Sequence, residues 1–255
     1  MNGVHAKDMP SSCAQKLRTR IDHFLPPQLQ EAVVVPEDLQ CERKMIIVNG
    51  PSGVGKTEYI RAKYPRYVSA STDHLQYTGP CRQRLFETRA RGADEDVFKT
   101  CEDLGQVVSD VVLRESFKTG ANVAFELNAG IDRAPSYERA LVLVFRPFEE
   151  AYANVMTRHH DVSKTSVPWA ANDFSDMHDY VSSNYVLHMQ KATNEFVQAN
   201  IPVSVVNTSG NRARPSTLKA ALKELTRAML FLHGGGAEST QLRRGAKKRG
   251  GSRKP

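Results

Sequence analysis

The sequence predicts an α/β protein with a mostly parallel, five-stranded sheet that is covered by helices on both faces. Short apolar segments alternate with longer segments whose apolar residues recur every three or four positions, which is the order typical of strands and helices in a parallel sheet. The first apolar segment runs into a glycine-rich turn that a helical pattern follows. The composition, 40% hydrophobic and 25% charged over 255 residues, is that of an ordinary globular protein.

The glycine-rich turn has the spacing of a phosphate-binding loop. It follows the predicted strand 45–49 and reads Gly50-Pro51-Ser52-Gly53-Val54-Gly55-Lys56-Thr57, which fits the pattern G-x-x-x-x-G-K-[ST]. Glycines let the backbone curl so that successive N–H groups hold phosphate oxygens, and the next helix adds the positive end of its dipole. We expect Lys56 to reach the β- and γ-phosphates and Thr57 to ligate Mg²⁺. The strand–loop–helix order therefore predicts the fold of the P-loop NTPases, with ATP and Mg²⁺ bound at residues 50–57.

A second predicted strand, 67–70, ends just before Asp73. The carboxyl ends of strands line the ligand crevice of an open α/β sheet, and we expect this strand to neighbour the phosphate loop. Asp73 is thus a candidate for the catalytic carboxylate. Aspartate also favours turns and helix caps, so a structural role for Asp73 stays open.

The third predicted strand, 122–128, carries Glu126 near its end and follows a helix predicted over 97–120. A carboxylate at this point can ligate Mg²⁺ or position an acceptor. The sequence has no apolar run that ends in an Asp-Glu pair, as expected of an ATP-hydrolysing motor that must polarise water. This absence favours phosphoryl transfer over hydrolysis.

Arg158 lies at the end of a helix that follows the fourth predicted strand, 140–145. The next segment, 162–174, has no clear periodicity, and we interpret it as a lid that excludes water from the reaction. Arg158 would stand at the hinge of this lid and neutralise charge on the transferring phosphate. The alternative is an arginine that complements the negative end of the helix dipole.

The last part of the pattern is a helix over 177–196, a fifth strand over 201–206 and a helix over 218–232. The polar turn that begins at Asn207 follows the fifth strand. We expect this turn, and Asn207 in it, to contact the nucleotide base.

We expect the chain to divide into an N-terminal extension with a short helix (1–44), a domain built around the phosphate loop (45–236) and a basic tail (237–255). The net charge of +7 comes from the tail, because seven lysines and arginines and no acidic residue follow Glu238. We expect this tail to be disordered. It would bind nucleic acid, direct localisation to the nucleus or only make the chain more soluble, and these alternatives stay open.

The chain has no apolar run long enough to span a membrane and no signal-peptide core near its start. We therefore expect a protein of the cytosol or nucleus that does not bind membranes. The four cysteines stand at positions 13, 41, 81 and 101, without a Cys-x-x-Cys pair. In such a compartment we expect all four to be reduced thiols.

The order of these motifs resembles the small P-loop kinases, and among them the zeta-toxin and polynucleotide-kinase-like family. The segment 50–57 matches the family's nucleotide loop, and Asp73 falls where the family places the acid that deprotonates the acceptor hydroxyl. Arg158 falls on the helix that supplies the family's lid arginines. The segments 125–129 and 206–209 resemble its acidic strand and its base-side turn.

The resemblance implies an ATP-dependent phosphotransferase whose acceptor is a nucleotide sugar, a nucleoside or a nucleic-acid end. Two other classes of function stay open. The chain is alternatively a nucleic-acid-associated protein in which nucleotide binding is regulatory, as the basic tail would suit. The third class is a nucleotide-hydrolysing switch, which needs no acceptor.

Overall fold

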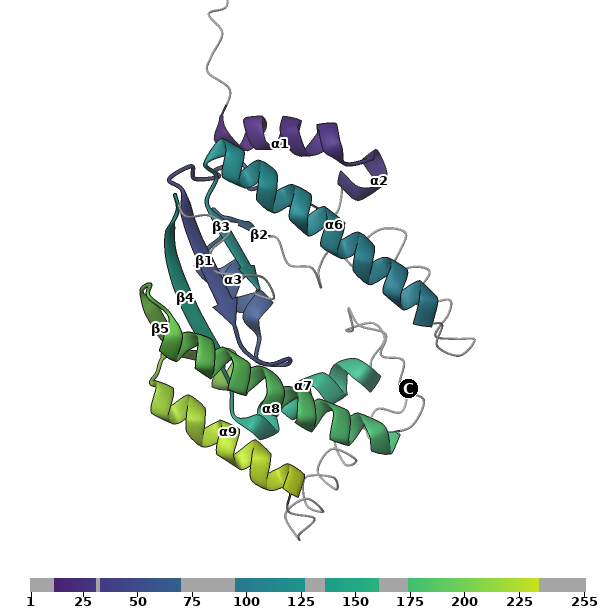
Figure 1. Ribbon diagram of the computed structural model, residues 1–255, viewed down its shortest axis with the longest axis vertical. Coiled ribbons are helices and arrows are strands. Elements are labelled where there is room, and N and C mark those ends of the chain that lie inside the picture. The colour runs from purple at the N-terminus through teal and green to yellow at the C-terminus, as the bar shows by residue number, and fades with distance from the viewer. Residues whose placement is uncertain (1–11, 31–32, 70–94, 127–135, 161–173, 234–255) are drawn as a thin grey trace, which may run out of the picture.

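The computed structural model describes residues 12–30, 33–69, 95–126, 136–160 and 174–233. Within these ranges the chain forms a six-stranded sheet with the strand order β2-β3-β1-β4-β5-β6. Figure 1 labels the first five strands. The strands are β1 (Lys44–Asn49), β2 (Val68–Ser69), β3 (Val123–Glu126), β4 (Glu138–Phe145), β5 (Val203–Asn207) and β6 (Arg214–Pro215). All neighbouring strands are parallel except β5 and β6, which pair antiparallel.

The predicted α/β architecture with a mostly parallel sheet is confirmed, and the structure adds one strand to the predicted five. The extra strand, β6, has two residues, one of them a proline, so no periodicity in the sequence marks it. It pairs Pro215 with Val206 after the chain turns back from β5.

The strand β2 lies at one edge of the sheet. We expected the strand before Asp73 to neighbour the phosphate loop; β2 pairs with β3, and β3 lies between β2 and β1, the strand that leads into the loop. All three apolar residues of β3, at positions 123–125, are buried, as suits an internal strand. Asp73 itself lies outside the described residues.

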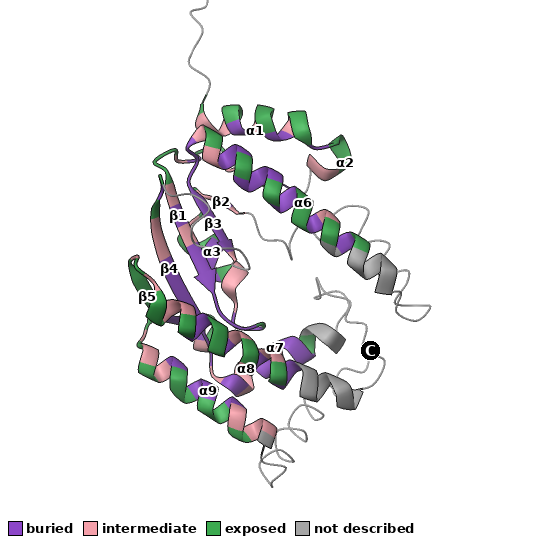
Figure 2. Cartoon of the chain, viewed as in Figure 1, coloured by how far each residue is buried: buried purple, intermediate pink, exposed green. Residues whose placement is uncertain are grey.

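Helices cover both faces of this sheet (Figure 1). They are α1 (Cys13–Phe24), α2 (Pro27–Gln30), α3 (Lys56–Lys63), α6 (Glu95–Thr119), α7 (Phe148–His160), α8 (Phe174–Gln198) and α9 (Leu218–His233). One core contains residues of α1 and α6 with Met45 and Ile47 of β1, and the other contains residues of α3, α7, α8 and α9 with Val48. This alternation along β1 is that of a strand buried on both faces, and Figure 2 shows the buried strands between the two helical layers.

The N-terminal helix α1 is attached to the sheet by packing, an ion pair and a disulfide. Leu17 and Ile21 are fully buried among the residues that face α6. Arg20 donates to the buried carboxylate of Glu115 in α6 at 2.8 Å. The predicted helix of the N-terminal extension is therefore present and shares a core with the sheet.

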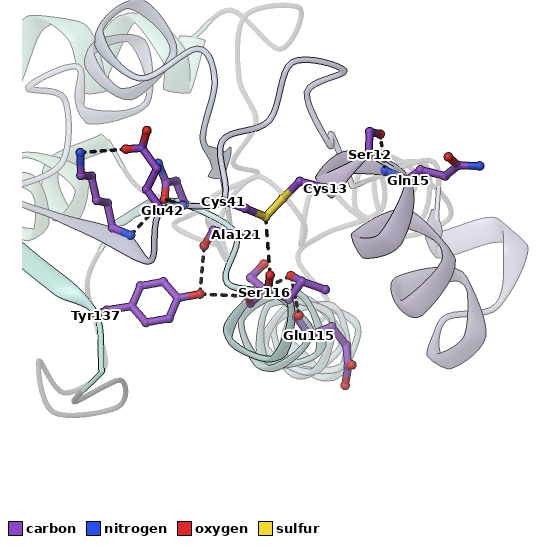
Figure 3. Close-up of a disulfide and its surroundings, with 12 residues drawn as sticks. Ser12, Cys13, Gln15, Cys41, Glu42, Glu115, Ser116, Ala121 and Tyr137 are labelled. Atoms are coloured by element: carbon purple, nitrogen blue, oxygen red, sulfur yellow. Dashed lines mark hydrogen bonds and ion pairs between the residues drawn. A yellow bond between two sulfur atoms is a disulfide. The ribbon is translucent and has the colours of Figure 1, made fainter. Parts of the chain in front are cut away.

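The disulfide joins Cys13, the first residue of α1, to Cys41 just before β1 (Figure 3). Cys101 is disulfide-bonded as well. The expectation of reduced thiols is therefore wrong for these three cysteines. It rested on the compartment alone, whereas Cys13 and Cys41 are 28 positions apart and meet only because α1 folds back along α6, which places their Cα atoms 6.2 Å apart.

No helix in the described part of the chain is both long enough and apolar enough to cross a lipid bilayer.

Candidate nucleotide-binding site

The phosphate loop connects the carboxyl end of β1 to α3 and is packed tightly against α7 and the end of β4. Gly50 has a φ of +147° and Gly53 a φ of +81°. A Cβ atom at Gly50 would overlap the carbonyl oxygen of Val144, and one at Gly53 would overlap the carbonyl oxygen of Ala151. Both positions therefore require glycine, for their backbone conformation and for lack of space.

Two carbonyl groups of the loop are held by side chains from distant elements. The Asn154 amide of α7 donates to the Gly53 carbonyl at 2.9 Å, and the Thr208 hydroxyl donates to the Val54 carbonyl. The carbonyl of a trans peptide points away from the N–H of the following residue. Fixing these two carbonyls therefore turns the N–H groups of Val54 and Gly55 away from α7 and the turn after β5, as a concave anion site requires.

Three residues that the sequence singled out meet at the start of α3. Lys56 Nζ lies 3.5 Å from Glu126 Oε2 and donates to the Pro51 carbonyl at 3.1 Å. The Thr57 hydroxyl donates to the other oxygen of Glu126. The side chains of Lys56 and Glu126 are only 16% and 12% exposed, so this group is shielded from solvent.

This donor set fits Mg²⁺. Magnesium in nucleotide-binding proteins takes one or two protein oxygen ligands together with phosphates and water, and the Thr57 hydroxyl and the Glu126 carboxylate are oxygen donors of that kind. The described residues contain no group of three or more His, Cys, Asp or Glu that would hold a metal ion without such help. The fit is therefore to a metal that arrives with phosphate rather than to a zinc site.

Helix α8 borders the same site through His188. Burial lowers the pKa of the His188 imidazole, and the positive charges of Lys56 and Lys191 lower the pKa further. The imidazole is therefore neutral at neutral pH and adds no positive charge beside Lys56.

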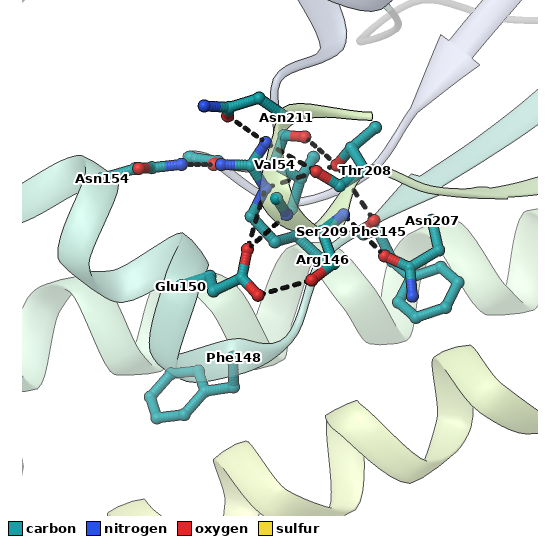
Figure 4. A network of polar contacts seen from close by, with 12 residues as sticks. Val54, Phe145, Arg146, Phe148, Glu150, Asn154, Asn207, Thr208, Ser209 and Asn211 are labelled. Atoms are coloured by element: carbon teal, nitrogen blue, oxygen red, sulfur yellow. Dashed lines mark hydrogen bonds and ion pairs between the residues drawn. The ribbon is translucent and has the colours of Figure 1, made fainter. Parts of the chain in front are cut away.

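The other wall of the site is a polar network around Arg146, the first residue after β4 (Figure 4). Arg146 is only 5% exposed. Its Nη2 donates to the Thr208 carbonyl at 2.8 Å and to Asn211 Oδ1 at 3.0 Å. A buried guanidinium thus holds the turn that follows β5.

Glu150 of α7 holds this turn from its other side. Its carboxylate accepts hydrogen bonds from the Ser209 hydroxyl and from the Gly210 N–H, the latter at 3.0 Å, and lies 4.0 Å from Arg146. Burial raises the pKa of Glu150, but these two hydrogen bonds and the charge of Arg146 outweigh burial and lower the pKa below its ordinary value. Glu150 is therefore a carboxylate at neutral pH, and the turn is fixed on both sides.

A pocket of about 540 Å³ opens between the phosphate loop, α3, α7 and this turn. Its lining residues are Gly55, Glu58, Tyr59, Ala62, Arg146, Asn154, Thr157, Thr208, Asn211 and Ala213. The pocket begins at the loop and extends toward the turn, and its volume lies in the range of small-ligand sites. It has the place and the size that a nucleoside attached to loop-bound phosphates needs.

The sequence also predicted Asn207, Arg158 and Asp73 for this site. Asn207 accepts a hydrogen bond from the Ser209 N–H at 2.8 Å, so its side chain shapes the turn, and Thr208 and Asn211 are the residues of the turn that line the pocket. Arg158 lies near the end of α7, as predicted, but its side chain falls outside the described residues. Asp73 and the predicted lid up to residue 173 also lie outside them.

Sequence reasoning missed Arg146 and Asn154, and it placed Thr208 in the base-side turn without a role of its own. Arg146 had a usable signal, because it is the first charged residue after an apolar strand, and strand ends line the crevice of such sheets. Asn154 had none, since it occupies one polar position among several on an amphipathic helix.

The fold of this chain is that of zeta-toxin-like P-loop kinases. The structure matches the zeta toxin PezT of the PezAT chromosomal toxin–antitoxin system from Streptococcus pneumoniae with a TM-score of 0.54. The two chains are 14% identical, and the match covers 94% of this chain and 97% of the other. The predicted resemblance is thereby confirmed at the level of the fold.

Two further solved structures are more distant. A predicted kinase from Chloroflexus aurantiacus matches with a TM-score of 0.47 at 12% identity, over 73% of this chain and 98% of the other. The AvrRxo1-ORF1:AvrRxo1-ORF2 complex, determined with sulphate ions, contains a chain that matches with a TM-score of 0.39 at 12% identity, over 84% of this chain and 72% of the other.

No protein-family model and no curated protein sequence matches this chain.

Proposed function

We propose that this protein is an ATP-dependent phosphotransferase that moves the γ-phosphoryl group to a hydroxyl of a nucleotide sugar, a nucleoside or a nucleic-acid end. The observation that carries the proposal is the group formed by Lys56, Thr57 and Glu126 beside the phosphate loop. A cation, a hydroxyl and a carboxylate at this point are what binding of Mg·ATP requires. The fold of P-loop kinases supports the proposal.

The described residues divide the binding of ATP among them. The N–H groups of the loop and the amino end of α3 hold the phosphates, and Lys56 neutralises the β- and γ-phosphates. Thr57 and Glu126 would hold Mg²⁺, which would offset the charge of the phosphates. The nucleoside occupies the pocket beside Arg146 and Asn211, and its base lies at the turn after β5.

The transfer step uses the two residues that were proposed from the sequence. Asp73 accepts the proton of the acceptor hydroxyl while that oxygen forms a bond to the γ-phosphorus. The bond between the γ-phosphorus and the β–γ bridging oxygen breaks, and ADP leaves with the electron pair. Arg158 neutralises charge on the transferring group.

The test is incubation of the purified protein with γ-labelled ATP, Mg²⁺ and separate acceptors: nucleosides, nucleotide sugars, and DNA and RNA with 5′-hydroxyl ends. Label should move to one acceptor class, and Lys56→Ala should serve as the blank. Asp73→Asn should abolish transfer and leave ATP binding largely intact. Label that moves only to water, at a rate that Asp73→Asn hardly changes, would instead identify a nucleotide-hydrolysing switch.

A second candidate function is nucleic-acid association with regulatory nucleotide binding. The observation that favours it is the group of seven cations after Glu238, which is suited to phosphate backbones and to salt-dependent binding. Removal of residues 237–255 separates the candidates. A truncated chain that still phosphorylates small acceptors but no longer retains nucleic acid is a kinase with an accessory tail. Phosphorylation that needs both the tail and a polynucleotide makes nucleic acid the acceptor.

A further inference from the structure

The start of the phosphate loop is held by Asn49, the last residue of β1. Asn49 is 8% exposed, and its Oδ1 accepts a hydrogen bond from the Gly50 N–H at 2.7 Å. Gly50 is also the residue whose Cα lies against the Val144 carbonyl. The Asn49 amide therefore fixes the first N–H of the loop at a point where the backbone cannot shift toward β4.

The Asn49 amide is itself oriented from α8. Its Nδ2 donates to the carboxylate of Glu195. This arrangement allows one amide orientation only: Oδ1 must face the Gly50 N–H, so Nδ2 must face an acceptor, and Glu195 is the acceptor. The hydrogen bonds thus run in sequence from Glu195 through Asn49 to the loop.

Glu195 is a charged residue on the apolar stripe of α8. The buried residues Tyr185, Met189 and Ala192 form the stripe of α8 that faces the sheet core, and Glu195 is the next position along it at helical spacing. A carboxylate there, where an apolar residue would pack, costs desolvation unless it is hydrogen-bonded. Asn49 supplies that hydrogen bond.

We propose that Glu195 is a positioning residue for nucleotide binding, which acts by orienting Asn49 and through it the first N–H of the phosphate loop. The inference rests on the proposed binding of ATP to that loop. The link between α8 and the loop consists of two hydrogen bonds: Asn49 donates to Glu195, and the Gly50 N–H donates to Asn49.

Exchanging donor and acceptor tests the inference. In Asn49→Asp, one carboxylate oxygen still accepts from the Gly50 N–H, but the other faces the Glu195 carboxylate, and like charges repel. We expect affinity for Mg·ATP to fall by about tenfold, since a charge-assisted hydrogen bond is replaced by repulsion. In the double variant Asn49→Asp/Glu195→Gln, the introduced glutamine amide donates to the introduced carboxylate on β1, and affinity should return to within about threefold of the unmodified chain.

Single variants on α8 complete the experiment. Glu195→Gln alone keeps an acceptor oxygen for Asn49 and should bind within about threefold of the unmodified chain, whereas Glu195→Ala leaves the amide without its acceptor and should bind more weakly. Asn194→Ala, at the exposed neighbouring position, is the matched control and should leave affinity unchanged.

Affinity is measured by calorimetry with the full chain and Mg·ATP, and the melting temperature of each variant is recorded without nucleotide. A merely structural role would lower the melting temperatures without changing the affinities, and that result would overturn the inference. So would an exchange variant that binds no more tightly than Asn49→Asp. Failure of the unmodified, folded chain to bind Mg·ATP is a separate outcome, which overturns the proposed function and the inference with it.

Discussion

Glu126 is the residue at which the contacts of the phosphate site meet. It lies 3.5 Å from Lys56, accepts from Thr57 and is the carboxylate that would ligate Mg²⁺. Each role depends on its charge, and the amide of a glutamine preserves its shape. The substitution Glu126→Gln thus isolates charge from packing.

We expect Glu126→Gln to lower kcat/KM for phosphoryl transfer by about 10–100-fold, because residues that support a bound metal contribute effects of that size. The Mg²⁺ concentration needed for half-maximal activity should rise as well. Activity measured against Mg²⁺ concentration checks both effects. The control is Glu138→Gln at an exposed position of β4, and an unchanged Mg²⁺ requirement in Glu126→Gln would contradict the assigned role.

Glu115 of α6 is a buried carboxylate of a different kind, surrounded by cations. Its partners are Arg20 at 2.8 Å, Arg114 at 2.9 Å and Lys118 at 2.9 Å. Burial raises the pKa of Glu115, but the hydrogen bonds from these three residues, with that from Lys118 the strongest, outweigh burial and lower the pKa below 4.5. The side chain is 0% exposed, so its charge depends on these partners.

The direction of this shift sets a pH dependence. A carboxylate with a lowered folded-state pKa contributes stability that is fully present above the unfolded-state pKa and is lost as the pH falls through the folded-state pKa. Glu115→Gln should therefore lower the free energy of unfolding at pH 7 by roughly 3 kcal/mol, and this difference should shrink as the pH falls below about 4.5. Urea unfolding of both proteins between pH 7 and pH 3 measures the difference in the free energy of unfolding. The control is Glu37→Gln, at an exposed position. A difference that is constant over this range would show that Glu115 stabilises the fold without its charge.

At the residue scale, the sequence predicted what is encoded locally. Lys56 and Thr57 could be singled out because the loop motif fixes their spacing to the glycines within eight residues. The contact between Arg146 and Thr208 joins residues 62 positions apart, and no local pattern records it. The same holds for Asn49 and Glu195, at a separation of 146.

At the scale of elements, helix α1 is joined to the rest of the molecule in a way that periodicity does not reveal. Its apolar stripe predicts packing against a neighbour but does not say which one. The structure shows that α6 is the neighbour and that the Cys13–Cys41 disulfide fixes the amino end of α1 near β1 (Figure 3). A disulfide restricts the unfolded chain, so its effect is a matter of stability.

Replacing both cysteines, in Cys13→Ser/Cys41→Ser, should lower the free energy of unfolding by about 2–4 kcal/mol for a loop of this length. Thermal unfolding of the oxidised proteins measures the difference as a lower melting temperature. Adding a thiol reductant should lower the melting temperature of the unmodified chain by more than that of the double variant, since the variant has already lost this bond. Equal melting temperatures for the two oxidised proteins would mean that packing and the Arg20–Glu115 pair hold α1 without the disulfide.

Elements with strong periodicity were predicted well, whereas the short strand β6 was not predicted. The long helices α6, α8 and α9 each carry an apolar stripe that spans several turns, and most of β4 is a continuous apolar run, so their type follows from the sequence. The two-residue strand β6 has no pattern to read. The position of β2 beside β3 depends on how the connections cross the sheet, which spacing along the chain does not determine.

At the scale of the whole molecule, the candidate site belongs mainly to one of the two helical layers. Helices α3, α7 and α8 contribute the loop's helix, the pocket wall and Glu195, and they share one core. Helices α1 and α6 pack on the opposite face with a second core (Figure 1). A ligand at the loop should therefore stabilise the two layers unequally.

Binding of Mg·ATP provides the test at this scale. At a concentration about 100 times Kd, a ligand that binds only the folded state adds about 2.7 kcal/mol to the free energy of unfolding. For a chain of this size, this gain should raise the melting temperature by about 5–10 °C. Hydrogen exchange should slow most at 50–57, 146–157 and 208–213, which form the loop and the pocket, and least in α1, because local openings there do not expose the site.

The control is Lys56→Ala. In this variant the rise in melting temperature should be largely lost, since the cation that meets the phosphates is gone. An equal rise in Lys56→Ala, or protection confined to α1 and α6, would place the nucleotide elsewhere on the molecule.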